Sequence, residues 1–240
     1  MWDFEQGEVL AFDKPIHWTS FDVVAKVRWN LCRKLGKKKL KVGHSGTLDP
    51  LATGVVIVCT GKKTKLIDHL QYDVKEYVAT LQLGATTPSY DMEKEVDATY
   101  PTAHITRDLI DEVIPTFQGK QWQTPPAFSA IQINGKRAYK FARKGEDVEL
   151  KPRLLVIDEI EVLNFNEQKM QLTIHVVCSK GTYIRALARD IGERLQSGAY
   201  LTALRRTRVG NTRVEDCLTI EQFLQQLESY DASNSSSIVR

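Results

Sequence analysis

The side chain with the clearest chemical use is Asp49, the only carboxylate in the turn-rich segment 43–50 (GHSGTLDP). A continuous apolar run at 55–59 follows it and predicts a buried strand. Pro50 fixes its own φ and biases the preceding residue toward extended backbone, so we expect Asp49 to be held in one pose. A carboxylate held at the mouth of a buried strand can act as a nucleophile or a general base. Because Asp-Pro is also an ordinary turn signal, the neighbouring residues must decide between these interpretations.

Two long motifs favour the chemical interpretation. Residues 43–54 (GHSGTLDPLATG) resemble the signature loop of the TruB family of pseudouridine synthases, in which the aspartate is the essential catalytic residue. Residues 179–185 (SKGTYIR) match a second motif of that family residue for residue. The resemblance extends over about residues 8–228, with shorter matches at 10–15, 75–77, 126–143 and 204–206. It implies an enzyme that isomerises a uridine in RNA to pseudouridine.

The same resemblance implies a role for individual side chains. Asp49 would be the essential carboxylate, and Arg185 would pair with it and keep it ionised in a partly desolvated pocket. Tyr77 would stack on the target uracil and assist proton removal at C5. Because the target uridine must leave its stack, His44 would fill the space left by flipped nucleotides and stack in the RNA. The other substrate-binding residues that we expect are Tyr183, Leu204, Lys14 and Lys65.

The reaction requires neither a cofactor nor a metal. It breaks the bond between N1 and C1′ and joins C5 to C1′, without redox change. The sequence leaves open whether Asp49 attacks C1′, attacks the base or removes a proton. The four cysteines form no C-x-x-C pair, which disfavours zinc. Four further histidines have no partner at metal-ligand spacing, so we expect them to be structural: His17, His69, His104 and His175.

Basic residues are clustered along the chain, although its net charge is only +3. Six positive side chains lie between residues 33 and 41, directly before the Asp49 segment, and further clusters lie at 62–65, 136–144 and 205–208. Four such clusters in a modestly charged chain indicate a surface that follows phosphates. We therefore expect tRNA as the partner, with the dense lysine run at 37–41 as a source of affinity.

Helix-like and strand-like segments are mixed without strict alternation, which predicts an α+β fold with a largely antiparallel central sheet flanked by helices. We expect one catalytic domain over residues 1–228, a long loop at 84–104, and a disordered tail at 229–240. No membrane span or signal segment is evident, so we expect a cytoplasmic monomer. The expected strands are 8–12, 55–60, 75–83, 127–133, 154–165, 169–179 and 201–209, and the expected helices are 19–35, 64–70, 106–117, 136–144, 183–195 and 219–227.

Two features depart from the family pattern. Many bacterial members carry a small RNA-binding domain after the catalytic one, whereas only a short polar tail follows residue 228 here. The loop at 84–95 has fewer acidic residues than usual, although Asp91 lies where the family has an aspartate; Tyr90 beside it has no assigned role. Our leading hypothesis is pseudouridine formation in the T arm of tRNA. The alternatives are the same reaction on another RNA, guided by partner proteins, and an RNA chaperone that refolds tRNA.

Overall fold

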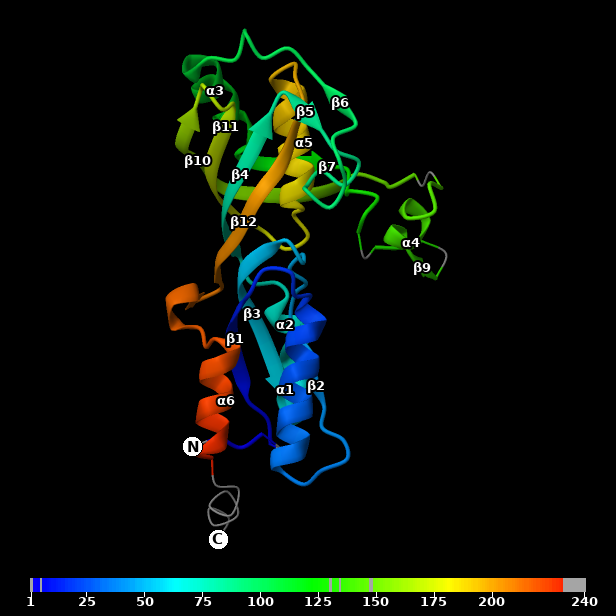
Figure 1. Cartoon of the computed structure of the whole chain (residues 1–240), viewed down its shortest axis with the longest axis vertical. Helices are drawn as coiled ribbons and strands as arrows, with labels where there is room; N and C mark the ends of the chain where they lie inside the picture. Colours follow the sequence, from blue (N-terminus) through cyan, green and yellow to red (C-terminus); the bar gives the residue numbers. More distant parts are fainter. Residues whose placement is uncertain (1, 5, 130, 134, 147–148, 231–240) are drawn as a thin grey trace. The chain divides into compact units, whose positions relative to one another are not determined.

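The computed structural model describes residues 2–4, 6–129, 131–133, 135–146 and 149–230 (Figure 1). The chain forms two compact units: a terminal unit of residues 1–75 and 205–240, and a middle unit of residues 76–204. It passes between them within two strands, β4 (Lys75–Leu83) and β12 (Ala199–Val209). The single catalytic domain over 1–228 stays a prediction. So does the disordered tail, most of which lies outside the described residues.

The terminal unit is built around the buried strand β3 (Ala52–Thr60), whose apolar run the sequence predicted. β3 lies between β1 (Val9–Lys14), its antiparallel partner, and the end of β12. The short strand β2 (Val42–His44) also pairs with β3. The remaining elements of this unit are a 3-10 turn at Gly61–Leu66, α2 (Ile67–Leu70), β13 (Thr212–Arg213), a 3-10 turn at Val214–Asp216 and α6 (Ile220–Glu228).

Helix α1 (Ser20–Lys34) forms where capping and apolar spacing predicted it. The Thr19 side chain accepts a hydrogen bond from the Asp22 backbone, and the Asp22 carboxylate accepts one from the Thr19 backbone, which makes a capping box. One face of α1 enters the core of the terminal unit through four side chains: Val23, Val24, Val27 and Leu31.

The middle unit holds the strand order β12, β4, β11, β10 and β7. The hairpin of β10 (Arg153–Asn166) and β11 (Gln171–Cys178) is antiparallel, as expected, and β7 (Gly119–Gln123) pairs with the start of β10 at the sheet edge. Inward-facing and outward-facing residues alternate along β4. The helices are α3 (Arg107–Val113), α4 (Ala138–Ala142) and α5 (Ile184–Arg194). The predicted α+β fold with a mostly antiparallel sheet is confirmed.

Several predicted boundaries in the middle unit are wrong. The strand expected at 127–133 is reduced to β8 (Gln132–Ile133), which pairs with β9 (Lys136–Arg137), and strand β7 was missed. The helix expected at 106–117 is shorter than predicted, because α3 ends at Val113. A 3-10 turn at Ile114–Phe117 follows it, since Pro115 cannot donate an α-helical hydrogen bond. The long loop at 84–104 contains a small hairpin of β5 (Ala85–Thr86) and β6 (Ala98–Thr99).

No helix in the described part of the chain is long and apolar enough to cross a lipid bilayer.

Candidate active site

The backbone around Asp49 is pinned on both sides by hydrogen bonds within the terminal unit. The Ser20 hydroxyl donates to the Leu48 carbonyl at 3.2 Å and accepts from the Leu48 amide at 2.8 Å. On the other side, the Ala52 amide donates to the Asp49 carbonyl at 3.0 Å, and the His17 amide donates to the Pro50 carbonyl at 2.7 Å. The side chain of Asp49 itself is half-buried. The loop therefore holds this carboxylate in one place and leaves part of it accessible.

Arg206 is a second support of the same loop, and the sequence analysis gave it a different role. Its guanidinium is buried and donates to the Gly46, Thr47 and Val55 carbonyls at 3.2, 3.2 and 2.7 Å. Gly54 has a φ of +109°, and a Cβ there would lie 2.1 Å from the Arg206 carbonyl oxygen. Only glycine allows so close an approach. Arg206 thus fixes the loop, and its burial contradicts the prediction that it follows phosphates.

The neighbours of Arg206 in this basic cluster also have partners within the terminal unit. Arg205 forms an ion pair with Asp13 at 2.8 Å, and Arg208 donates to the Gly210 carbonyl at 2.9 Å. The sequence showed three arginines, but only the structure shows how their donors are used.

Lys14 places a buried cation close to Asp49. Its side chain is fully buried, and its ammonium donates to the Pro15 and Trp18 carbonyls at 2.9 and 2.7 Å. Burial, the largest cause, and the positive charge of Arg206 together lower the pKa of Lys14 from 10.5 to about 8, although the negative charge of Asp49 opposes both effects. Asp49 therefore lies within the electrostatic reach of a lysine that changes its charge close to neutral pH.

His44, at the end of β2, is better suited to stacking on a base than to forming a charged contact. Burial is the main cause that lowers the pKa of its imidazole, and the positive charge of Arg206 adds to the effect, so both favour the neutral ring. Its Nδ1 is buried and has no hydrogen-bond partner among the described residues. Lys65 is exposed on the 3-10 turn that follows β3, and Lys37, Lys38, Lys39 and Lys41 are exposed between α1 and β2.

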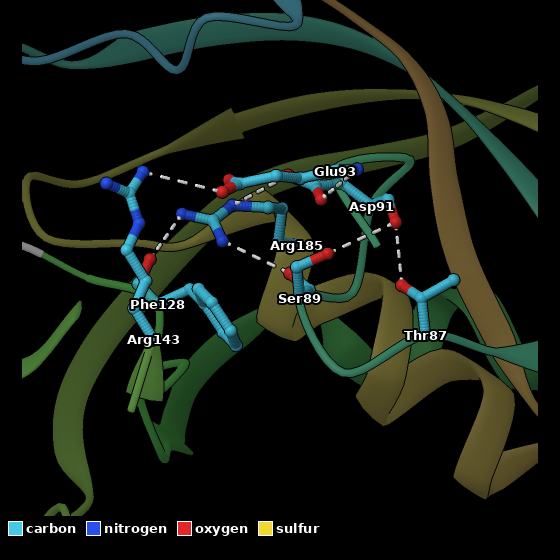
Figure 2. Close-up of polar contacts among 7 residues, drawn as sticks. All are labelled: Thr87, Ser89, Asp91, Glu93, Phe128, Arg143 and Arg185. Carbon is cyan, nitrogen blue, oxygen red and sulfur yellow. Dashed lines mark hydrogen bonds and ion pairs between the residues drawn. The ribbon is translucent and has the colours of Figure 1, made fainter. Parts of the chain in front are cut away.

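Arg185 occupies a buried position at the start of α5 in the middle unit, where Figure 2 shows its partners. Its Nε lies 3.6 Å from Oδ2 of Asp91, and both side chains are less than a tenth exposed. Its two terminal nitrogens donate to the Ser89 carbonyl at 3.1 Å and to the Phe128 carbonyl at 2.9 Å. The planar fork of arginine serves three acceptors in different directions, which a lysine could not do.

The loop that presents Asp91 is tightly closed by its own hydrogen bonds (Figure 2). The Thr87 and Ser89 hydroxyls both donate to the Asp91 carbonyl, at 2.7 and 3.3 Å, and the Glu93 amide donates to its carboxylate at 2.9 Å. Glu93 in turn forms an ion pair with Arg143 at 3.6 Å. Asp91 was noted in the sequence only by position, and its role as the partner of Arg185 was missed.

Tyr90, which had no assigned role, anchors this loop. It adopts a φ of 60°, which is uncommon for a residue other than glycine. Its carbonyl accepts from the Leu201 amide at 3.0 Å, and the guanidinium of Arg189 lies 5.1 Å from its ring centre. The conformation of Tyr90 turns the chain so that the Asp91 carboxylate faces Arg185.

The other predicted site residues of the middle unit lie on three elements. Tyr77 is buried on the inward face of β4, Leu204 is half-buried on β12, and Tyr183 caps α5, with its amide donating to the Gln123 side chain at 2.9 Å. Asp49, Lys14, His44 and Lys65 belong to the terminal unit, whereas Tyr77, Tyr183, Arg185 and Leu204 belong to the middle unit. The pairing of Asp49 with Arg185 stays a prediction.

One histidine has neighbours that sequence spacing did not show. Within the described residues, ligand atoms of Glu159, Glu161 and His175 lie within 4.8 Å of one another. Antiparallel pairing of β10 with β11 sets Glu161 opposite His175, and Glu76 lies 3.6 Å from the same imidazole. The prediction that His175 has no partners of metal-binding type is therefore wrong. The prediction that the reaction uses no metal is untested. All four cysteines are free.

Comparison with protein families matches two models that together span residues 33–240. Residues 33–184 match the TruB family pseudouridylate synthase (N terminal domain), and residues 185–240 match the tRNA pseudouridylate synthase B C-terminal domain. The second match includes α5, β12 and α6. The departure from the family pattern that we expected after residue 228 is not tested by this match.

Curated relatives named tRNA pseudouridine synthase B align with nearly the whole chain. The Phocaeicola vulgatus protein is 65% identical over 95% of this chain and 97% of its own length. The Flavobacterium johnsoniae protein is 48% identical, with 94% and 98% covered. The Chlorobium luteolum protein is 49% identical over 90% of this chain but only 74% of its own length.

Solved structures also align with nearly the whole chain, at lower sequence identity. A chain of a Cbf5-Nop10-Gar1 complex aligns with a TM-score of 0.69 and 28% identity, covering 96% of this chain and 57% of that one. A chain of an H/ACA RNP bound to a substrate RNA aligns with a TM-score of 0.66 and 27% identity, covering 95% and 57%. With the signature motifs, the family models and relatives of 48–65% identity in agreement, the chain belongs to the TruB family of pseudouridylate synthases.

Proposed function

We propose that this protein converts a uridine in the T arm of tRNA to pseudouridine, with Asp49 as the essential carboxylate. The observation that carries the proposal is the Asp49 loop: a carboxylate pinned by backbone hydrogen bonds, beside the buried cations Lys14 and Arg206. The names of the curated relatives support tRNA as the substrate. We propose a cytoplasmic monomer that uses no cofactor and no metal.

The residues divide the work of the reaction. The target uridine leaves its stack and enters the pocket, where Tyr77 stacks on the uracil and Tyr183 and Leu204 form the walls. Asp49 acts on the nucleotide while the N1–C1′ bond breaks and the C5–C1′ bond forms. C5 then loses its proton with assistance from Tyr77, and N1, whose bond to C1′ is broken, gains a proton, so that no atom is lost overall. Whether Asp49 attacks C1′, attacks the base or removes a proton is a choice among three mechanisms that share this site.

In this proposal, Arg185 orients the carboxylate of Asp49. Its charge is already balanced by Asp91 within the middle unit, and two carbonyls fix its plane. A guanidinium held so rigidly can orient a carboxylate without itself moving. His44 and Lys65 contact the RNA around the flipped nucleotide.

The test is incubation of the protein with an unmodified tRNA transcript, followed by position-resolved mapping of pseudouridine. We expect one modified uridine, in the T arm, and none in a transcript with cytidine at that position. Modification only of uridines outside the T arm would contradict the proposed position in tRNA. Improved tRNA folding without any pseudouridine would support the chaperone alternative and contradict the proposal.

A further inference from the structure

The solvent-facing side of α1 carries two exposed aromatic rings, each paired with an arginine. Phe21 and Trp29 are 58% and 57% exposed. The guanidinium of Arg28 lies 5.7 Å from the Phe21 ring centre, and that of Arg33 lies 5.5 Å from the Trp29 ring centre. At a rise of about 1.5 Å per residue, the two rings lie roughly 12 Å apart along the helix. We call these four side chains the α1 stripe.

The α1 stripe has no role in the core of the terminal unit. The helix buries its opposite face, through Val24, Val27 and Leu31 among others, and that face supplies the packing. Single exposed apolar residues are common, but large aromatic rings repeated along one helix face mark an interaction surface. Basic residues also dominate the exposed part of α1, where Lys26, Arg33 and Lys34 outnumber Asp22. The charge therefore favours an anionic partner.

The α1 stripe joins the Asp49 loop to the lysine run within the terminal unit. At its first end, Phe21 directly follows Ser20, whose hydroxyl exchanges hydrogen bonds with the backbone of Leu48. At its other end, α1 leads into the exposed lysines at 37–41, and Figure 1 shows this loop leaving the end of α1 and turning back to β2. A basic and aromatic track thus runs from the candidate catalytic carboxylate along the whole helix.

We propose that the α1 stripe binds unpaired nucleotides of the substrate RNA that flank the target uridine. Base faces stack on Phe21 and Trp29, while Arg28 and Arg33 sandwich the rings and neutralise phosphates. Since every base has a stacking face, this surface adds affinity and does not read sequence. The inference rests on the proposed function, because it places the target uridine at Asp49.

The test compares two substitutions of one ring. Trp29→Leu keeps an apolar side chain but removes the stacking face, whereas Trp29→Phe keeps the face. Base stacking of ~1–3 kcal/mol corresponds to a loss of about five-fold or more in affinity. We therefore expect Trp29→Leu to weaken binding of unmodified tRNA transcript by about five-fold or more, and Trp29→Phe to retain most of the affinity. The matched control is Trp122→Leu in β7, which removes a 71% exposed ring that has no arginine over it among the described residues.

Two further readouts separate binding from folding and from catalysis. The melting temperature of Trp29→Leu should match that of the wild type, since the ring lies outside the core. The single-turnover rate of pseudouridine formation at saturating enzyme should also be unchanged. Unchanged tRNA affinity in Trp29→Leu would overturn the inference, and the α1 stripe would then be a surface for another protein. If the wild type forms pseudouridine normally in that case, the proposed function stands while this inference fails.

Discussion

The terminal and middle units each contain a buried arginine that holds a loop, and the two arginines differ in their partners. Arg206 directs its donors to three carbonyls of the Asp49 loop and β3. Arg185 divides its donors between two carbonyls and pairs with the carboxylate of Asp91. Arg206 therefore places its positive charge on the backbone of the Asp49 loop, whereas the charge of Arg185 is paired with that of Asp91. The same residue type serves in one unit as a scaffold and in the other as a pre-oriented part of the site.

This difference changes how the charge of Asp49 is balanced. The sequence assigned that role to Arg185, by resemblance to the family. Within the terminal unit, Lys14 already supplies a positive charge that interacts with Asp49, and Arg206 holds the same loop. We therefore expect Arg185 to act mainly by orienting the Asp49 carboxylate. Loss of its planar guanidinium should then lower the rate of pseudouridine formation more than a change in net charge does.

Arg185→Lys should produce the largest effect among the supporting residues. Lysine keeps the positive charge beside Asp91 but cannot also reach the Ser89 and Phe128 carbonyls. We expect the single-turnover rate of pseudouridine formation to fall by about 100-fold, roughly 2.7 kcal/mol in activation free energy. The control is Arg194→Lys at the last turn of α5. Near-normal turnover in Arg185→Lys would show that the fork has no part in the reaction.

Arg206→Lys should act first on stability. It leaves buried carbonyls of Gly46, Thr47 or Val55 without their donor, and each such group costs about 1–3 kcal/mol. We expect the free energy of unfolding to fall by about 2–4 kcal/mol and the rate to fall by about ten-fold as the Asp49 loop loosens. Denaturant titration and single-turnover assays measure the two effects, with Arg208→Lys as control. A stability equal to that of the wild type would contradict a scaffold role.

Lys14 should give opposite pH dependences of rate and stability. Its pKa is lowered from 10.5 to about 8, so between those values the unfolded chain binds more protons than the folded one. Its contribution to stability therefore rises as pH increases from about 8 to 10.5. Over the same range Asp49 loses a neighbouring cation, and we expect the single-turnover rate to fall several-fold, on the scale of a partly screened charge pair. Lys14→Met should be slower but lack this alkaline fall; a flat wild-type profile up to pH 9.5 would refute the coupling.

The lysine run should give the smallest effect, and only on binding. Replacing Lys37, Lys38 and Lys39 with Gln removes up to three phosphate contacts. Each lost contact should flatten the dependence of log affinity on log salt by somewhat under one, with about 0.9 for duplex DNA as the upper guide. Affinity for tRNA should fall most at low salt, with the rate at saturating enzyme unchanged. An unchanged salt slope would mean that the run is only a solvated loop.

Local patterns in the sequence were enough to predict much of the fold. β4 forms over the predicted residues because buried and exposed side chains alternate along it, and α1 forms because its cap and its apolar spacing agree. Predictions failed where distant contacts decide. The segment at 127–133 has strand-like composition, but among its described residues only Gln132 and Ile133 pair in a strand.

Candidate site residues can be selected from sequence where they lie in a contiguous motif and not where the fold brings distant residues together. Asp49 and Arg185 lie in motifs, which were enough to select them as candidates, and their roles stay predictions. In the sequence Arg206 is one of three clustered arginines, and only its exposed fraction in the structure shows that it is buried. Asp91 meets Arg185 across 94 residues of chain, and His175 meets Glu161 only through strand register. No local sequence pattern encodes contacts between residues so far apart in the chain.

The most direct test of the central claim is the rate of pseudouridine formation by Asp49→Asn under single turnover, measured together with tRNA affinity. Asparagine is nearly the same size as aspartate but can serve neither as a nucleophile nor as a base. We expect the rate to fall below one-hundredth of the wild-type value, with tRNA affinity within about two-fold of the wild type, a difference of roughly 0.4 kcal/mol. A rate above one-hundredth of wild type, with the T-arm uridine still modified, would show that another residue performs the chemistry assigned to Asp49.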